Sequence, residues 1–140
     1  MNDKGVATTL DYILIFIISS IILTSSFLVL STLKSNVKSE TKKEVLENTG
    51  NKIKDEILEI YLNGYLGEGK VTKELNIPTD ASGDIYRVGF DDGKLSLESG
   101  EVIVKINLNK IQSSVELDGS FYSSERQKKV FYNGSEIVLR

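Results

Sequence analysis

The stretch Tyr12–Leu33 reads YILIFIISSIILTSSFLVLSTL and contains no charged side chain. Of its 22 residues, 15 are apolar and the other seven are Ser or Thr. An α-helix rises about 1.5 Å per residue, so this stretch would be about 33 Å long, enough to cross a hydrocarbon core of about 30 Å. The sequence therefore predicts a helix that lies in a membrane or in the apolar core of a filament.

A secretory signal and a buried core helix both fit the apolar stretch less well. A cleaved secretory signal has an apolar region of about 7–15 residues behind a positively charged start, whereas this stretch is longer and follows only Asn2-Asp3-Lys4. A buried core helix of this length would need more surrounding protein than the rest of the chain supplies. Membrane lipid is therefore an expected partner.

The composition of residues 34–140 favours a structural or binding protein over an enzyme. These residues include 16 Lys and Arg and 18 Asp and Glu, interleaved without a basic face, so no nucleic-acid partner is expected. The chain has no Cys and no His, which removes disulfides, the usual zinc ligands, the thiol nucleophile and the commonest general base. No spacing motif points to other catalytic chemistry, so we expect no catalytic residues, no metal and no cofactor.

The helix is predicted to continue beyond the apolar stretch. No Pro or clear stop separates Leu33 from Leu62, and an apolar stripe at helical spacing follows the uncharged run. The stripe consists of Leu46, Ile53, Ile57 and Ile60, with Tyr61 at its margin. Gly50 lies on the same stripe and suits either a close backbone approach or a bend. Asn63-Gly64 is expected to end the helix.

From Val71 onward the period changes to two, which predicts an antiparallel sheet. Asp92-Gly93 is a strong two-residue hairpin signal. Folding about this turn pairs apolar residues on one face and places Arg87 opposite Glu98 on the other. A second turn at Ser99-Gly100 is expected to place Glu98 opposite Glu101.

Two more features extend the sheet. A hairpin at Asn133-Gly134 is expected to join Val130–Tyr132 to Ile137–Leu139, and residues 115–121 suggest one more strand. The result is an α+β fold, in which the amphipathic half of the long helix covers an antiparallel meander of about five or six strands.

In the N-terminal residues, Lys4-Gly5 is followed by an acid, Asp11, and then by the long apolar helix. This pattern resembles the N-terminus of archaeal type IV pilin-like (pseudopilin-like) proteins. In such proteins a prepilin-type peptidase cuts before the apolar stretch and leaves it in the mature subunit. The resemblance implies cleavage between Gly5 and Val6. Asp11 would then be the sixth mature residue, whereas these proteins typically carry a Glu at the fifth.

Two sets of residues in the helix have alternative interpretations. In a filament, Asp11 would pair with the α-amino group of a neighbouring subunit and set the axial register; otherwise it lies in the headgroup zone, favoured by the helix N-terminus. Ser20, Thr24 and Ser31 share one side of the helix and suit close helix packing. Their hydroxyls would otherwise bond to carbonyls of their own helix.

Two sequence features of the C-terminal half bear on location and family. Asn133-Gly134-Ser135 is the only Asn-x-Ser/Thr triplet and is a candidate glycosylation site, although Asn-Gly is also a preferred type I′ turn. Ile77-Pro78, Gly83 and Tyr86 are expected at a strand end, a turn and a strand. They also resemble a Pro…Gly…Tyr pattern in the β-domains of the same pilin-like proteins.

The expected segments are a leader at residues 1–5, a transmembrane or filament-core helix at 6–33, an amphipathic helix and linker at 34–66, and a β-domain at 67–140. The resemblance implies a structural subunit, with a prepilin-type peptidase and other pilin-like subunits as partners. It would span the cell membrane once with the β-domain outside, or lie in an extracellular filament. The lysines that follow the span, Lys34, Lys38, Lys42 and Lys43, favour the opposite orientation. The alternative function is a membrane-anchored surface protein that binds a partner and does not polymerise.

Overall fold

The computed structural model consists of one long helix and seven strands. It describes residues 3–67, 69–108, 111 and 114–140, with side chains described from Thr9 onward. Helix α1 is Asp3–Gly67. The strands are β1 (Val71–Glu74), β2 (Arg87–Asp91), β3 (Lys94–Ser99), β4 (Val102–Asn107), β5 (Glu116–Tyr122), β6 (Lys129–Tyr132) and β7 (Glu136–Leu139). Contacts divide the chain into two compact units, Met1–Lys38 and Ser39–Arg140.

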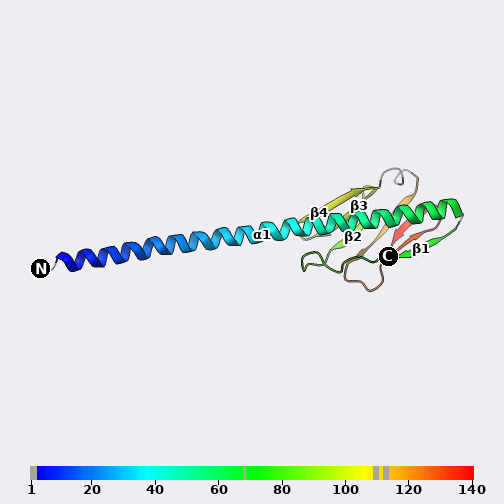
Figure 1. Ribbon diagram of the computed structural model, residues 1–140. Coiled ribbons are helices and arrows are strands. Elements are labelled where there is room, and N and C mark those ends of the chain that lie inside the picture. Colours follow the sequence, from blue (N-terminus) through cyan, green and yellow to red (C-terminus); the bar gives the residue numbers. More distant parts are fainter. Residues whose placement is uncertain (1–2, 68, 109–110, 112–113) are drawn as a thin grey trace. The chain divides into compact units, whose positions relative to one another are not determined.

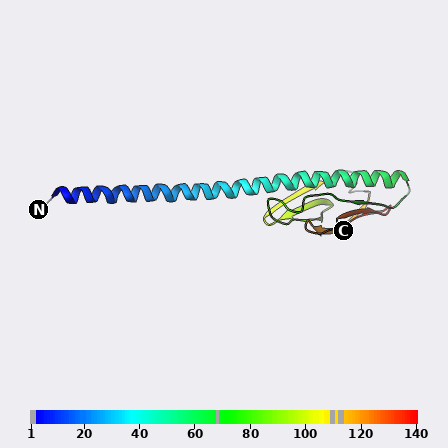
Figure 2. The same cartoon turned by 60° about the horizontal axis from the view of Figure 1, so that its bottom comes forward.

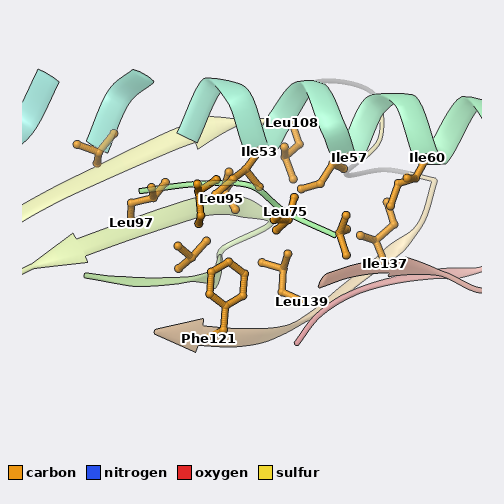
Figure 3. Close-up of a cluster of buried hydrophobic side chains, with 14 of the residues drawn as sticks. Ile53, Ile57, Ile60, Leu75, Leu95, Leu97, Leu108, Phe121, Ile137 and Leu139 are labelled. Atoms are coloured by element: carbon orange, nitrogen blue, oxygen red, sulfur yellow. The ribbon is translucent and has the colours of Figure 1, made fainter. Parts of the chain in front are cut away.

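Within the second unit, α1 covers one face of the sheet. Figure 1 shows the C-terminal part of the helix crossing the strands, and Figure 2, turned by 60°, shows it along one side of them. The stripe predicted from the sequence is buried: Leu46, Ile53, Ile57 and Ile60 are each at most 1% exposed. Figure 3 shows three of these side chains pointing at strand residues such as Leu95, Phe121 and Leu139. The α+β fold class and the covered apolar face are confirmed.

The strand order differs from the predicted meander. The sheet has seven strands in the order β1-β6-β7-β5-β2-β3-β4. All neighbouring pairs are antiparallel except β5 and β7, which are parallel. Strands that follow one another in sequence lie side by side in the sheet only in β2-β3-β4 and in β6-β7. Strand β5 inserts between β2 and β7. These long-range pairings leave no local turn signal, so the expected meander of five or six strands is wrong.

The first hairpin has the predicted register, and the second is shifted by two residues. Arg87 lies opposite Glu98, as predicted around Asp92-Gly93. In the second hairpin Ser99 pairs with Val102, and Glu98 lies opposite Ile103 rather than Glu101. The turn residues are therefore Gly100 and Glu101. Gly100 has φ 61°, and a glycine with positive φ at the first central position is typical of a type II′ turn.

The last hairpin joins the predicted strands through a different turn. Asn133 pairs with Glu136 through the Asn133 N–H and the Glu136 carbonyl, at 3.2 Å. The central residues are thus Gly134 and Ser135, and the predicted type I′ turn with Asn133 at its centre is wrong. The Asn133 Oδ1 instead accepts hydrogen bonds from the backbone N–H groups of Ser135 (3.0 Å) and Glu136 (2.8 Å), an arrangement in which an Asn side chain stabilises a turn.

Both helix glycines on the apolar stripe allow close approach to the sheet. A Cβ at Gly50 would lie 2.3 Å from Ile106 Cδ1. Of the two predicted roles of Gly50, this distance supports the close backbone approach and not the bend. A Cβ at Gly64 would lie 2.2 Å from Tyr132 Cδ1. The predicted end of the helix at Asn63-Gly64 is wrong, since α1 continues to Gly67. The Tyr132 ring occupies the space beside Gly64 and also packs edge-on against Tyr61, with centroids 5.8 Å apart.

The connection between β1 and β2 is irregular and carries a buried tyrosine. Ile77-Pro78 does not end a strand, and Tyr86 lies just before β2, so both strand assignments are wrong; Gly83 lies in a turn as predicted. The Tyr86 hydroxyl donates a hydrogen bond to the Pro78 carbonyl at 2.5 Å. Burial raises the pKa of Tyr86 to about 12, with a smaller rise from the nearby Asp80 charge.

Candidate assembly surface on the N-terminal helix

The apolar side chains that are described in the first unit are all exposed. Every described residue from Thr9 to Lys38 is exposed, including Phe16 and Phe27, each 73% accessible. The buried core of the chain begins only at Leu46. This segment therefore presents an apolar helix surface that the β-domain core does not use.

The exposed apolar surface is slightly longer than the uncharged run. Leu10, before Asp11, is 61% exposed, and Val37, after Lys34, is 60% exposed. The predicted transmembrane or filament-core helix at 6–33 includes Leu10 but ends before Val37. Val37 was missed because the prediction ended at Lys34, the first charged residue after the run.

Several hydroxyl residues of the span donate hydrogen bonds to carbonyls of their own helix. Ser20 Oγ donates to the Phe16 carbonyl and Thr24 Oγ1 to the Ser20 carbonyl, both at 2.8 Å. Ser26 and Thr32 do the same with the carbonyls four residues earlier. This supports the intrahelical interpretation for Ser20 and Thr24 and satisfies polar atoms that would be costly in lipid. Ser31, the third residue of the predicted packing strip, is exposed.

The predicted processing site lies at the start of α1. The backbone of Lys4, Gly5 and Val6 is helical, and their side chains lie outside the described residues, as do Met1 and Asn2. Asp11 is exposed on the helix surface, one residue before the uncharged run. The cleavage site and the pairing role of Asp11 stay predictions.

Lys42 and Lys43, which follow the span, form ion pairs. Lys42 Nζ lies 2.6 Å from Asp84 Oδ2, and the Lys42 side chain is 13% exposed. Lys43 Nζ lies 3.8 Å from Glu47 Oε1 on the next helical turn. Lys42 therefore has a structural reason to be present that does not depend on which side of a membrane the domain occupies.

Acidic residues elsewhere are also engaged in ion pairs. Lys73 lies 2.5 Å from both Glu56 and Glu59, and these contacts raise the pKa of Lys73.

The described residues contain no group of three or more His, Cys, Asp or Glu side chains arranged to hold a metal ion. Asn133, the predicted glycosylation site, donates through Nδ2 to Glu136 Oε2 at 3.1 Å. Its modification stays a prediction.

Comparisons with protein-family models, curated proteins and solved structures find no match to this chain. The architecture itself is pilin-like: a long apolar N-terminal helix packed through its C-terminal part on a β-sheet. Helix α1 is long enough and apolar enough to cross a membrane, and its most apolar stretch is unburied. The chain thus has the features of a single-span protein with a folded C-terminal domain.

Proposed function

We propose that this protein is a minor pilin-like structural subunit of an archaeal type IV pilus-like filament or secretion assembly. The observation that carries the proposal is the exposed apolar helix segment from Leu10 to Leu33, in a chain whose second unit, Ser39–Arg140, has a core of its own. Such a surface requires a cover. Lipid covers it before assembly, and the same helices of neighbouring subunits cover it afterwards.

The proposed assembly begins with removal of the leader. A prepilin-type peptidase cuts between Gly5 and Val6 and creates a positively charged α-amino group at Val6. In the filament core, Asp11 of one subunit pairs with that amino group of a neighbour. A carboxylate in apolar surroundings is costly unless it is paired, so the pair favours one axial register. The β-domain lies outside the cell and is displayed on the filament surface.

The first experiment determines the mature N-terminus of the native membrane-associated protein by intact mass and N-terminal peptide sequencing. We expect a start at Val6. A start at Met1 or Asn2 would contradict processing and leave a membrane-anchored β-domain.

A substitution tests the role of the acid. Asp11→Ala is expected to reduce filament yield by about tenfold or more, because the neighbouring amino group loses a desolvated partner. Asp11→Glu should restore part of the yield, and Glu40→Ala, an exposed acid on the same helix, serves as the control. Filaments are counted by electron microscopy at matched subunit levels. Equal yields for Asp11→Ala and Glu40→Ala would contradict the pairing.

The alternative is a single-pass membrane-anchored protein that binds a partner and does not polymerise. The observation that favours it is the cluster of lysines after the span, which fits a domain on the cytoplasmic side better than one outside. In that case the leader remains attached and Asp11→Ala has no effect on localisation. The mature N-terminus therefore distinguishes the two functions.

A further inference from the structure

Two side chains of opposite charge occupy opposed positions on β2 and β3, but each bonds to a different partner. Arg87 lies directly opposite Glu98, on the face away from the core because the adjacent Val88 and Leu97 are buried. Side chains at such positions start about 5 Å apart, so an ion pair is expected. Instead, Arg87 Nη2 donates to Ser120 Oγ and Glu98 Oε1 accepts from Ser96 Oγ, each at 3.2 Å. Within the described part of the sheet, no ion pair joins the two charges.

The space between these side chains is a hollow of about 260 Å³ on the solvent-facing side of the sheet. Its lining residues are Arg87, Gly89, Phe90, Asp91, Ser96 and Glu98. Gly89 lies in the interior of β2 with unbroken register to both neighbouring strands. No positive φ accounts for a glycine there. A Cβ at Gly89 would lie 3.1 Å from Ser120 Cβ, so the glycine allows close approach of β5 and leaves no side chain of its own in the hollow.

The polar groups around the hollow are balanced in charge. Asp91 is in an ion pair with Lys105, with their atoms 2.5 Å apart. That contact lowers the pKa of Asp91 and raises that of Lys105, so both are charged and satisfied by each other. Arg87 and Glu98 supply one further charge of each sign. The site therefore has spare donors on Arg87 and a spare acceptor on Glu98 without a net charge, which suits neutral hydroxyl groups.

Apolar side chains flank the same row of residues. Tyr122 on β5 lies opposite Arg87 and is 54% exposed, and Ile103 on β4 lies opposite Glu98 and is 56% exposed. Ser96 within the hollow is only 4% exposed. Tyr122 and Ile103 lie beside the hollow and not in its lining, so they offer apolar surface next to its polar groups, a combination that small-molecule sites use.

We propose that this hollow binds a sugar unit of a neutral saccharide. Arg87 donates to one hydroxyl, Glu98 accepts from another, and the carbon face of the ring packs against Tyr122. A free amino acid would also offer one group of each sign, and it is the competing ligand that glycine tests. This ligand role goes beyond assembly and does not depend on polymerisation.

The test uses the full-length protein in lipid nanodiscs, free of glycoside detergents. Saturation-transfer NMR is performed with methyl glycosides of glucose, galactose, mannose and N-acetylglucosamine, and with glycine and phosphate as charged probes. At least one neutral glycoside is expected to bind saturably at millimolar concentration. Arg87→Gln and Glu98→Gln should each weaken it by about tenfold, because each removes a charge-assisted hydrogen bond.

Glu101→Gln is the matched control, since Glu101 is exposed in the turn of the same hairpin and outside the hollow. It should leave binding unchanged. Glu98→Gln keeps the size of the side chain, so it decides the test if Arg87→Gln fails to fold. The proposal is overturned if no glycoside binds saturably, if Glu98→Gln binds as tightly as Glu101→Gln, or if only glycine or phosphate binds.

Discussion

Gly119 shows how a single residue permits the parallel pairing of β5 and β7. It lies opposite Leu139 and has φ 93°, a conformation that L side chains rarely adopt. A Cβ at this position would lie 2.1 Å from the Leu139 carbonyl oxygen. Because that atom belongs to the backbone of a central strand, it has little freedom to move. Gly119 is thus required both by its own conformation and by its neighbour.

We predict that Gly119→Ala lowers the free energy of unfolding by more than about 2 kcal/mol, since it combines backbone strain with an overpacked contact. The control is Gly134→Ala: Gly134 has φ 102° but nothing within 4 Å of the added Cβ. Gly134→Ala should cost only the conformational strain. Chemical denaturation followed by circular dichroism measures both, and equal losses would show that the Leu139 contact is unimportant.

Arg87 and Glu98 illustrate what could be predicted about single residues. Their opposition across the hairpin followed from the Asp92-Gly93 turn and the alternation around it, and it is confirmed. The direction of the two side chains did not follow, because it depends on Ser96 and on Ser120. Ser120 is 33 residues from Arg87 in sequence, and nothing local to the hairpin indicates it.

Among the elements, the amphipathic half of α1 was the most predictable. Its apolar residues recur at helical spacing, and burial against the sheet follows from that periodicity. Its end was less predictable, since the packing of the Tyr132 ring on Gly64 depends on a residue from β6. The β3–β4 register was missed by two residues, and the turn by one, because both registers keep the same side chains on the apolar face.

We predict unequal effects of truncation along this helix. Ile57→Ala should lower the free energy of unfolding by about 2–5 kcal/mol, because Ile57 is fully buried and its removal leaves a cavity. Leu62→Ala, on the same helix, is the control: Leu62 is 53% exposed, and the change should be within about 0.5 kcal/mol. Thermal and denaturant unfolding measure the difference. Equal effects would contradict the orientation of the helix on the sheet.

For the whole molecule, the first unit contributes no buried side chain among its described residues. The core extends from Leu46 to Leu139 and draws on α1, the strands and the connections between them. Its stability is therefore expected to be independent of Met1–Lys38, whose exposed apolar residues instead determine solubility.

We predict that a chain lacking Met1–Lys38 is soluble without detergent and folds cooperatively. The full-length protein and a chain lacking only residues 1–5 should both require lipid or detergent, because both keep the apolar stretch. Size-exclusion chromatography and amide-proton NMR spectra provide the measurement. Aggregation or a collapsed, poorly dispersed spectrum for the shorter domain would show that the core needs the N-terminal segment.

The sequence by itself determined the apolar helix, its amphipathic continuation, the Asp92-Gly93 hairpin and the strands joined near Asn133. These features depend on periodicity and turn chemistry within short stretches of chain. Only the tertiary structure decided the insertion of β5 between β2 and β7, the parallel pair that Gly119 permits and the hollow beside Arg87. Each of these joins segments distant in sequence, and such contacts depend on the packing of the complete core rather than on any local pattern.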